Sequence, residues 1–404
     1  MTFSCLMKYD FENAVDRRGC SACKFMGVPA DTVPMSIADM DFKAPPELLE
    51  ELVKKAEFGN FGYTVMDEGD YGAVIDFVKW RHGMEIPRSD LVATPGVLNT
   101  MRCAMYVLSS PGDKVMVSLP LHTPSIRTAG MQGRVPVENW LQRRPGGDYT
   151  FDLEDMERGF REGARVLLMC NPNNPVGREW SLEELQEVAR LAIQYDVKVI
   201  SDEVHRDLVY SGHRHVCIAG LPGMAERTVT VFSASKTFNL GGMHIGSAVV
   251  ANREWRERLV AKFYEYGHES GRAPVFSTVA QTAACTRCRG WLLELVEVLE
   301  RNADMALHYL EGLPVFARRP DASFILWIDC SELGLDTAGL MELLQDARIT
   351  ADPGHYYKTA DIFGYDGPQD HFRLTFGMPG GVLEPALARL RKAIEKRLAC
   401  GRRR

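Results

Sequence analysis

The chain has 404 residues, a length that favours two or three domains rather than one. It is 46% hydrophobic and 25% charged, which is close to the globular average and excludes collagen-like and disordered chains. Its net charge of −7 argues against a generally basic nucleic-acid binder. We find no run of the roughly 18 apolar residues that a membrane span needs, and we expect no signal peptide. These features together predict a cytoplasmic protein.

Ten cysteines are too few for a disulfide scaffold in a chain of this length, so we expect reduced thiols. Two pairs have Cys-x-x-Cys spacing, Cys20/Cys23 and Cys285/Cys288. Together they would offer four thiolates to a zinc ion. A structural zinc site usually draws its ligands from one small module, however, and these pairs lie far apart in the chain. We therefore predict no metal.

Short apolar runs alternate with helical patterns through the middle of the chain. The runs are rich in Val and Ile and bounded by Gly, Pro, Asn or Asp, which predicts buried strands. They are Lys114–Leu119, Arg165–Met169, Val197–Ser201, Thr228–Phe232 and Gly246–Val250. Between them, Ser181-Leu-Glu-Glu184 is a capping box that predicts a helix to about Gln194. This order predicts an α/β fold with a mostly parallel sheet covered on both faces.

The last part of the chain has a different pattern. Trp291–Leu310 and Glu384–Leu398 read as helices, and Ser323–Ile328 and Phe372–Phe376 read as strands. We interpret this part as a smaller α+β domain. The expected division is an N-terminal segment 1–45 that packs with the small domain, a large domain 46–288 and the small domain 289–404.

Lys236 directly follows one predicted strand, in the sequence Ser233-Ala-Ser-Lys236. A phosphate-binding P-loop is ruled out, because no Gly-x-x-x-x-Gly precedes the lysine. A lysine partly removed from water has a lowered pKa and can attack a carbonyl group. A plain surface lysine is the alternative that this motif alone leaves open.

Three more features lie where strands are expected to end, at the edge where open α/β sheets place ligands. Asp202 and Glu203 end an apolar strand and need a cationic partner, although a helix cap or a metal ligand would also explain them. Asn174 lies in the irregular turn Asn171–Gly177, where it can present its amide to a ligand. The glycine of Thr94-Pro-Gly96 precedes a helical pattern whose first N–H groups can bind phosphate.

In order and spacing, these four features resemble the fold-type I enzymes of pyridoxal 5′-phosphate (PLP), the class I/II aminotransferase superfamily. The resemblance covers nearly the whole chain and is most specific to the MalY/PatB-type cystathionine β-lyases, also called C–S lyases. It rests on four motifs: Met35–Phe42 (MSIADMDF), Phe61–Thr64 (FGYT), Ser201–Asp207 (SDEVHRD) and Ser235–Leu240 (SKTFNL). It implies an aspartate-aminotransferase-like fold, with a seven-stranded sheet between helices in the large PLP-binding domain.

The resemblance also implies roles at the cofactor. Lys236 would carry PLP and move the substrate Cα proton, and Asp202 would pair with the pyridinium nitrogen. Asn174 would bind the ring's 3′-oxygen, and His205 stands where many aminotransferases place a tyrosine on that oxygen. The expected phosphate ligands are the backbone at Gly96, Val97 and Leu98, the side chains of Ser233 and Ser235, and Tyr63 from a neighbouring subunit. Shared sites of this kind imply a homodimer.

For the substrate, the resemblance implies that Arg373 clamps the α-carboxylate, because the planar guanidinium meets a carboxylate through two hydrogen bonds. The backbone near Ile37 and Ala38 would close over the same group. The implied partner is therefore a small amino-acid substrate, with neither nucleic acid nor membrane.

Four positions depart from the family pattern. His122, in Leu119–Pro124, replaces the tyrosine that stacks on the cofactor ring and assists proton transfer. The resemblance therefore implies a catalytic role for His122, because a histidine can stack there and can titrate near neutral pH. Ser36 replaces a tryptophan, which would enlarge the entrance. His244 stands where aminotransferases carry a phosphate-binding arginine, which argues against an ordinary aminotransferase. The segment Gly377–Gly380 replaces the family's Pro-Arg ending.

The sequence thus predicts a PLP-dependent C–S β-lyase that acts on L-cystathionine or an S-substituted L-cysteine and releases a thiol, pyruvate and ammonia. The main alternative is an aminotransferase of an L-amino acid, which would use the same lysine, aspartate, asparagine and arginine. A regulatory binding protein that keeps the cofactor site is a third possibility, and it would need an exposed apolar patch.

Overall fold

The computed structural model describes residues 7–401, except for residues 131, 132, 146, 270, 271, 359 and 365. The outer ends of the expected first and last segments, residues 1–6 and 402–404, lie outside the described residues. No helix within the described ranges is both long enough and apolar enough to cross a membrane.

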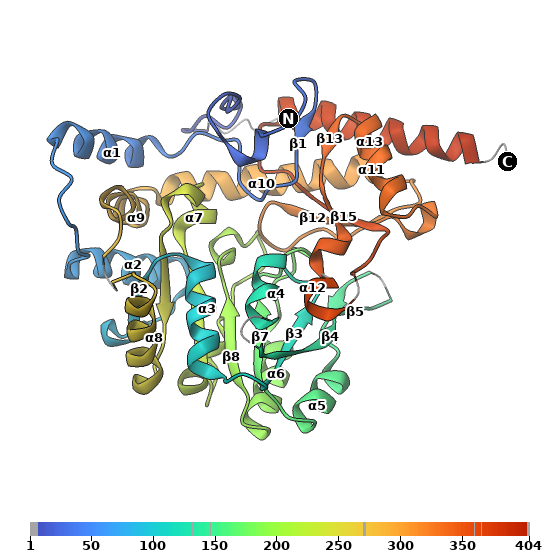
Figure 1. Ribbon diagram of the computed structural model, residues 1–404. Coiled ribbons are helices and arrows are strands. Elements are labelled where there is room, and N and C mark those ends of the chain that lie inside the picture. Colours follow the sequence, from blue (N-terminus) through green and yellow to red (C-terminus); the bar gives the residue numbers. More distant parts are fainter. Residues whose placement is uncertain are drawn as a thin grey trace.

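A seven-stranded sheet lies at the centre of the larger part of the molecule (Figure 1). In spatial order its strands are β2 (Leu91–Thr94), β10 (Gly246–Val249), β9 (Thr228–Phe232), β8 (Lys198–Asp202), β7 (Ala164–Cys170), β3 (Lys114–Leu119) and β4 (Val135–Trp140). Only β10 runs antiparallel to its neighbours. The predicted mostly parallel sheet is therefore confirmed.

Helices cover both faces of this sheet. One layer holds α3 (Val97–Leu108), α4 (Thr123–Gly130) and α8 (Arg253–Glu265), and the other holds α5 (Leu153–Arg161) and α6 (Leu182–Gln194). Successive side chains of a strand point to opposite faces, so Ile200 packs with the α3 layer and Val199 with the α6 layer. Both faces are buried, which explains why these strands are continuously apolar.

The helix expected after Ser181 is α6, and its capping box is formed. The backbone N–H of Glu184 donates to Ser181 Oγ over 3.2 Å, and the N–H of Ser181 donates to Glu184 Oε2 over 2.9 Å. These two bonds satisfy N–H groups that the helix itself leaves without partners.

A smaller antiparallel sheet has the order β11 (Phe316–Ala317), β12 (Ile325–Asp329), β15 (His371–Thr375) and β14 (Asp352–Pro353). The helices α10 (Arg289–Leu310), α11 (Thr337–Asp346) and α13 (Gly380–Gly401) lie beside it (Figure 1). The N-terminal segment joins this part, because β1 (Val33–Pro34) pairs in parallel with β13 (Ile349–Thr350). The division into a segment 1–45, a large domain and a small domain stays a prediction.

The remaining elements are short or flank the large sheet. They are α1 (Pro46–Phe58), α2 (Glu68–His82), α7 (Ala234–Thr237), α9 (Val275–Arg287), α12 (Ala360–Phe363), β5 (Gln142–Arg143) and β6 (Tyr149–Thr150). The helices α1 and α9 pack against each other on the side of the molecule where β2 lies (Figure 1).

Candidate active site

A cavity of about 350 Å³ opens where β2, β7, β8 and β9 end. It gathers most of the residues that the sequence singled out. Those that line it are Ala38, Gly96, Val97, Leu98, His122, Asn174, Asp202, His205, Ser235 and Lys236. The carboxyl edge of the sheet therefore forms one site from segments that are far apart in the chain.

Lys236 lies on the single-turn helix α7, directly after β9. Its Nζ donates a hydrogen bond to the backbone oxygen of Ala38 over 2.6 Å. Burial and the positive charge of Arg373 lower the pKa of Lys236 to about 8, against the opposing effect of Asp39 and Asp202. A substantial fraction of this amine is therefore neutral near pH 8 and can act as a nucleophile or a base.

Asp202 is the last residue of β8 and is only 4% exposed. Burial raises its pKa to about 6, although the backbone N–H of Val204 donates to Oδ1 over 3.2 Å. Burial destabilises a carboxylate when no close cation compensates it. The site thus presents an acid whose charge a cationic group in the cavity would stabilise.

His205 and Asn174 each present a polar group to the cavity. The Nδ1 of His205 shares a hydrogen bond of 2.8 Å with Ser323 Oγ, while Nε2 is buried and has no partner among the described residues. Burial, more than the nearby positive charge of Lys236, holds the pKa of His205 well below its usual value. The Oδ1 of Asn174 accepts a hydrogen bond from Arg373 Nη1 over 3.1 Å, which directs the amide nitrogen elsewhere.

The start of α3 forms an anion cradle at the cavity wall. Its cap, Gly96, has a φ of 100° and provides no side-chain hydrogen bond, so the first N–H groups at Val97 and Leu98 are not capped. The turn also lies close to β10: a Cβ on Gly246 would be 2.7 Å from Thr94 Oγ1. Uncapped N–H groups and the helix dipole favour a phosphate at this position.

The two serines expected at the phosphate differ in position. Ser235 lines the cavity, but Ser233 does not. The hydroxyl of Ser233 caps α7 by accepting from the N–H of Ser235 over 3.0 Å, and it donates to the oxygen of Ile245 over 2.6 Å. We therefore interpret Ser233 as a residue that shapes the turn.

Arg373 lies on β15 and is 2% exposed. Its Nη2 donates to Asp352 Oδ2 over 2.6 Å and also to the backbone oxygen of Ser36. Arg373 and Asp352 are register partners on the antiparallel strands β15 and β14, which explains their contact. Ile37, which is 39% exposed, and Ala38, which is buried, directly follow Ser36. The backbone expected to cover the substrate therefore lies next to the contact between Ser36 and Arg373.

His122 lies in the cavity just after β3, and its Nδ1 is 3.3 Å from Ser125 Oγ. Burial, followed by the charges of Arg373 and Lys236, lowers the pKa of His122 to about 3. The expected titration near neutral pH is therefore wrong, because desolvation and two cations disfavour the imidazolium. The neutral ring of His122 is therefore favoured near pH 7.

Tyr63 lies outside this cavity and is 98% exposed. The guanidinium carbon of Arg272 is 5.7 Å from the centre of its ring. Its neighbours Phe58, Phe61 and Val65 are also exposed, by 70%, 54% and 57%. Within one chain, the aromatic side chain is therefore displayed on the surface.

Several residues of the cavity were not expected as ligands. Arg102 and Asn99 lie on α3, one helical turn apart, and Arg102 Nη1 donates to Asn99 Oδ1 over 3.4 Å. The sequence offered one signal for them: they follow Leu98 on the same helix, so they could have been expected near the same end of the cavity. His244, noted for standing at an arginine position, also lines the cavity.

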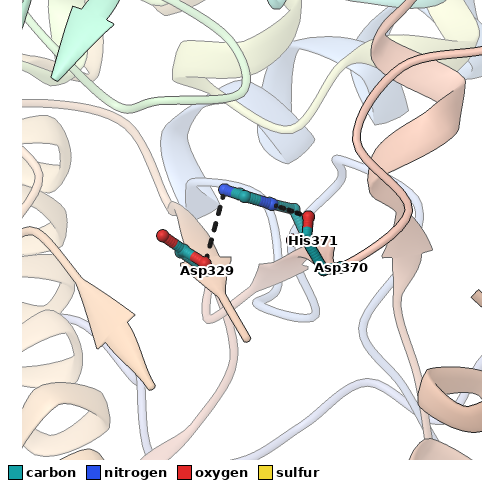
Figure 2. Close-up of side chains that lie close together, drawn as sticks. All are labelled: Asp329, Asp370 and His371. Atoms are coloured by element: carbon teal, nitrogen blue, oxygen red, sulfur yellow. Dashed lines mark hydrogen bonds and ion pairs between the residues drawn. The ribbon is translucent and has the colours of Figure 1, made fainter. Parts of the chain in front are cut away.

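The four cysteines considered for zinc do not form one site: Cys20 and Cys23 are exposed, and Cys285 and Cys288 are buried in the core. A different group, Asp329, Asp370 and His371, lies together beside the small sheet (Figure 2). The ring of His371 stands between the two carboxylates, 2.6 Å from Asp370 and 3.7 Å from Asp329. Arg143 Nη1 also pairs with Asp329 Oδ2 over 2.6 Å.

The family model described as aminotransferase class I and II matches residues 30–390. Cystathionine beta-lyase PatB of Bacillus subtilis is 33% identical, and the match covers 95% of this chain and 100% of PatB. Protein MalY of Escherichia coli is 25% identical, and the match covers 96% of this chain and 99% of MalY. The structure of cystalysin from Treponema denticola, which contains pyridoxal 5′-phosphate, has a TM-score of 0.89 and 28% identity over 96% of this chain and all of its own. A PLP-bound putative aminotransferase from Clostridium difficile has a TM-score of 0.90 and 29% identity over the same shares. The chain therefore belongs to the aminotransferase class I and II family, and the expected likeness to PatB- and MalY-type proteins is confirmed.

Proposed function

We propose that the chain is a PLP-dependent C–S β-lyase, which cleaves L-cystathionine or an S-substituted L-cysteine to a thiol, pyruvate and ammonia. The observation that carries the proposal is the cavity at the carboxyl edge of the sheet. It joins a lysine of lowered pKa, a buried aspartate and an uncapped helix start, and Arg373 is hydrogen-bonded to one of its lining residues. Relatives at 27% and 33% identity are named cystathionine beta-lyases, which points to the same chemistry.

The residues present fit PLP. Burial raises the pKa of Asp202 in spite of the nearby charge of Lys236, and a protonated pyridine nitrogen would further stabilise the carboxylate. The unpartnered Nε2 of His205 and the amide nitrogen of Asn174 are available to a ring oxygen. The uncapped N–H groups of α3 suit a phosphate. When bound, PLP would supply an electron sink for negative charge that develops at the substrate Cα.

Each side chain then has a defined task. Lys236 would hold the cofactor and, once released, its neutral Nζ would take the proton from the substrate Cα. Asp202 would keep the ring nitrogen protonated. His122, neutral at working pH, would lie against the ring without adding charge. Arg373 would orient the substrate by binding its α-carboxylate through two hydrogen bonds.

We also propose a homodimer in which Tyr63 reaches the cofactor phosphate of the neighbouring subunit. The exposure of Tyr63 outside the cavity of its own chain supports this arrangement. We further propose the domain division 1–45, 46–288 and 289–404, supported by the separation of the seven-stranded sheet from the four-stranded sheet. The free thiols of the described cysteines support a cytoplasmic location.

An aminotransferase remains the second candidate, since it would use the same side chains. It is favoured by one relative, kynurenine–oxoglutarate transaminase 3 of Mus musculus, which is 27% identical over 83% of this chain and 78% of its own. His244 in place of a phosphate-binding arginine counts against it.

Product analysis separates the two. The purified PLP-loaded protein is given L-cystathionine or an S-alkyl-L-cysteine without any keto acid. The lyase predicts thiol, pyruvate and ammonia in equal amounts over many turnovers, and none from a Lys236→Ala variant. One stoichiometric turnover that stops with the cofactor in its amine form would show an aminotransferase instead. No turnover with any of these substrates would overturn the lyase proposal.

A further inference from the structure

One arginine at the candidate active site carries a charge that no nearby carboxylate balances. Arg102 lies on α3 and lines the cavity that also contains Lys236 and Asp202. Its Nη1 donates to Asn99 Oδ1 over 3.4 Å, which is a long hydrogen bond to an uncharged group. Arg102 forms no ion pair with any residue that the structure describes. Its guanidinium therefore retains donors and charge for a group from outside the chain.

The guanidinium of Arg102 lies toward the start of its own helix. Helical side chains lean toward the N-terminus of the helix, and the bond to Asn99, three residues earlier, gives this direction for Arg102. Asn99 directly follows Val97 and Leu98, the first residues of α3, whose N–H groups are not capped. The charged side chain and the uncapped N–H groups therefore face the same end of the cavity.

This arrangement concentrates positive charge at one place. The N-terminus of a helix carries a partial positive charge, so a cation beside it is unfavourable unless an anion binds to both. Asp202 is the one carboxylate among the described residues that line the cavity. Burial raises its pKa, and the charges that act on it most are those of Lys236 and Glu203. Asp202 therefore does not balance the charge of Arg102.

The groups at the start of α3 suit a phosphate. Beside Arg102 they include the uncapped N–H groups and the hydroxyl of Ser235. A phosphate monoester carries about −1.5 to −2 charges at pH 7 and offers three strong acceptor oxygens. Backbone N–H groups at a helix start and an arginine fork are two of the donors that proteins use to bind it. One phosphate could thus satisfy the helix start and the arginine together.

We propose that Arg102 binds the phosphate group of PLP and supplies the main positive side-chain charge that holds it. His244, which stands where an arginine was expected in aminotransferases, lines the same cavity and is exposed. The guanidinium for the phosphate would then come from α3 instead of from the turn after α7. This inference rests on PLP as the cofactor, and it holds for C–S cleavage and for amino-group transfer alike.

The test compares two cofactors that differ only in the phosphate group, PLP and pyridoxal. The dissociation constant of each is measured by equilibrium dialysis of the loaded protein, for wild type and for Arg102→Met. We expect Arg102→Met to weaken PLP binding by at least ~10-fold, because the phosphate loses a charged donor. Pyridoxal binding should change by less than about 2-fold, since pyridoxal has no group that reaches the arginine. A loss confined to PLP would place the guanidinium at the phosphate.

Two further variants make the result specific. Arg102→Gln removes the charge but can still donate to Asn99, so it should weaken PLP binding as Arg102→Met does. Arg190→Met changes an exposed arginine on α6 and should leave the binding of both cofactors unchanged.

Two results would each overturn the proposal. One is PLP binding that Arg102→Gln retains at the level of wild type, because the charge would then be dispensable. The other is an equal loss of PLP and pyridoxal binding, because Arg102 would then shape the helix and not contact the phosphate. If Arg102→Met does not fold, Arg102→Gln still decides the question.

Discussion

The Nη1 of Arg373 donates a hydrogen bond to Asn174 Oδ1 over 3.1 Å, and this bond joins the proposed substrate clamp to the proposed cofactor ligand. The two residues come from different sheets: Arg373 lies on β15, and Asn174 follows β7. A substrate carboxylate that reorients the arginine would therefore also move the hydrogen-bond partner of Asn174, the residue proposed to bind the cofactor.

Replacing Arg373 tests its role at the substrate. We expect Arg373→Gln to lower kcat/KM for an S-alkyl-L-cysteine by about 100-fold or more, because it removes a buried charged partner of the carboxylate. Steady-state kinetics of the PLP-loaded enzyme measure this change, with Arg190→Gln on the surface of α6 as the control. An Arg373→Gln enzyme with unchanged kcat/KM would remove Arg373 from the substrate site.

The pKa of Lys236 can be read from its reactivity in protein freed of cofactor. Burial and the charge of Arg373 lower it to about 8, so reductive methylation by formaldehyde should reach half its maximum near pH 8. Lys54 is the internal control, because the hydrogen bonds that it donates to Glu50 and Glu51 raise its pKa, and its labelling should need a higher pH. Peptide mass spectrometry follows both residues in one sample. Parallel labelling curves for the two lysines would contradict the prediction.

Stability should depend on His215. Burial alone would lower its pKa, but Glu179 and Glu203 outweigh that effect and raise it to about 10. The pKa of His215 is higher in the folded state than in the unfolded state. Its contribution to the free energy of unfolding is therefore complete below pH 6.5 and is lost as the pH rises through 10. We expect His215→Gln to lower the free energy of unfolding by roughly 3–5 kcal/mol at pH 7, because two buried carboxylates lose their cation.

Urea unfolding at pH 6 and pH 10.5 measures this effect. The difference between wild type and His215→Gln should shrink at the higher pH, while the exposed variant His308→Gln should match wild type at both. A constant difference between the two pH values would show that the charge of His215 does not stabilise the fold.

Tyr63 allows a test of shared active sites by subunit complementation. Tyr63→Ala and Lys236→Ala homodimers are each expected to be nearly inactive. In a mixed dimer, one of the two sites has both the wild-type lysine and the wild-type tyrosine, so random mixing should restore about one quarter of wild-type activity. Activity that does not rise after mixing would show that Tyr63 does not act on the neighbouring subunit.

The sequence predicted the central strands well, because β3, β7, β8 and β9 are buried on both faces and read as unbroken apolar runs. It missed β2 and β4, which lie at the two edges of the sheet. β2 has only four residues, and β4 contains Pro136, which is tolerated at an edge but hides the strand pattern.

The sequence motifs also brought most of the candidate site together, since each follows a strand that ends at the same edge. Asp352 was not expected there, because it meets Arg373 only through the pairing of β14 with β15. The neutral state of His122 was equally hidden: it depends on burial and on the cations of Arg373 and Lys236, which the fold brings near. Motifs indicate which residues gather, whereas their charge states depend on the packing around them.

The segment 36–38 has a consequence for how substrate enters. The backbone oxygen of Ser36 accepts from Arg373, and that of Ala38 accepts from Lys236. A carboxylate that binds Arg373 would therefore compete with the carbonyl of Ser36 for the same donor, and the net gain from that hydrogen bond would be smaller than its strength alone. The segment 36–38 thereby couples the position of the chain over the site to whether Arg373 is engaged.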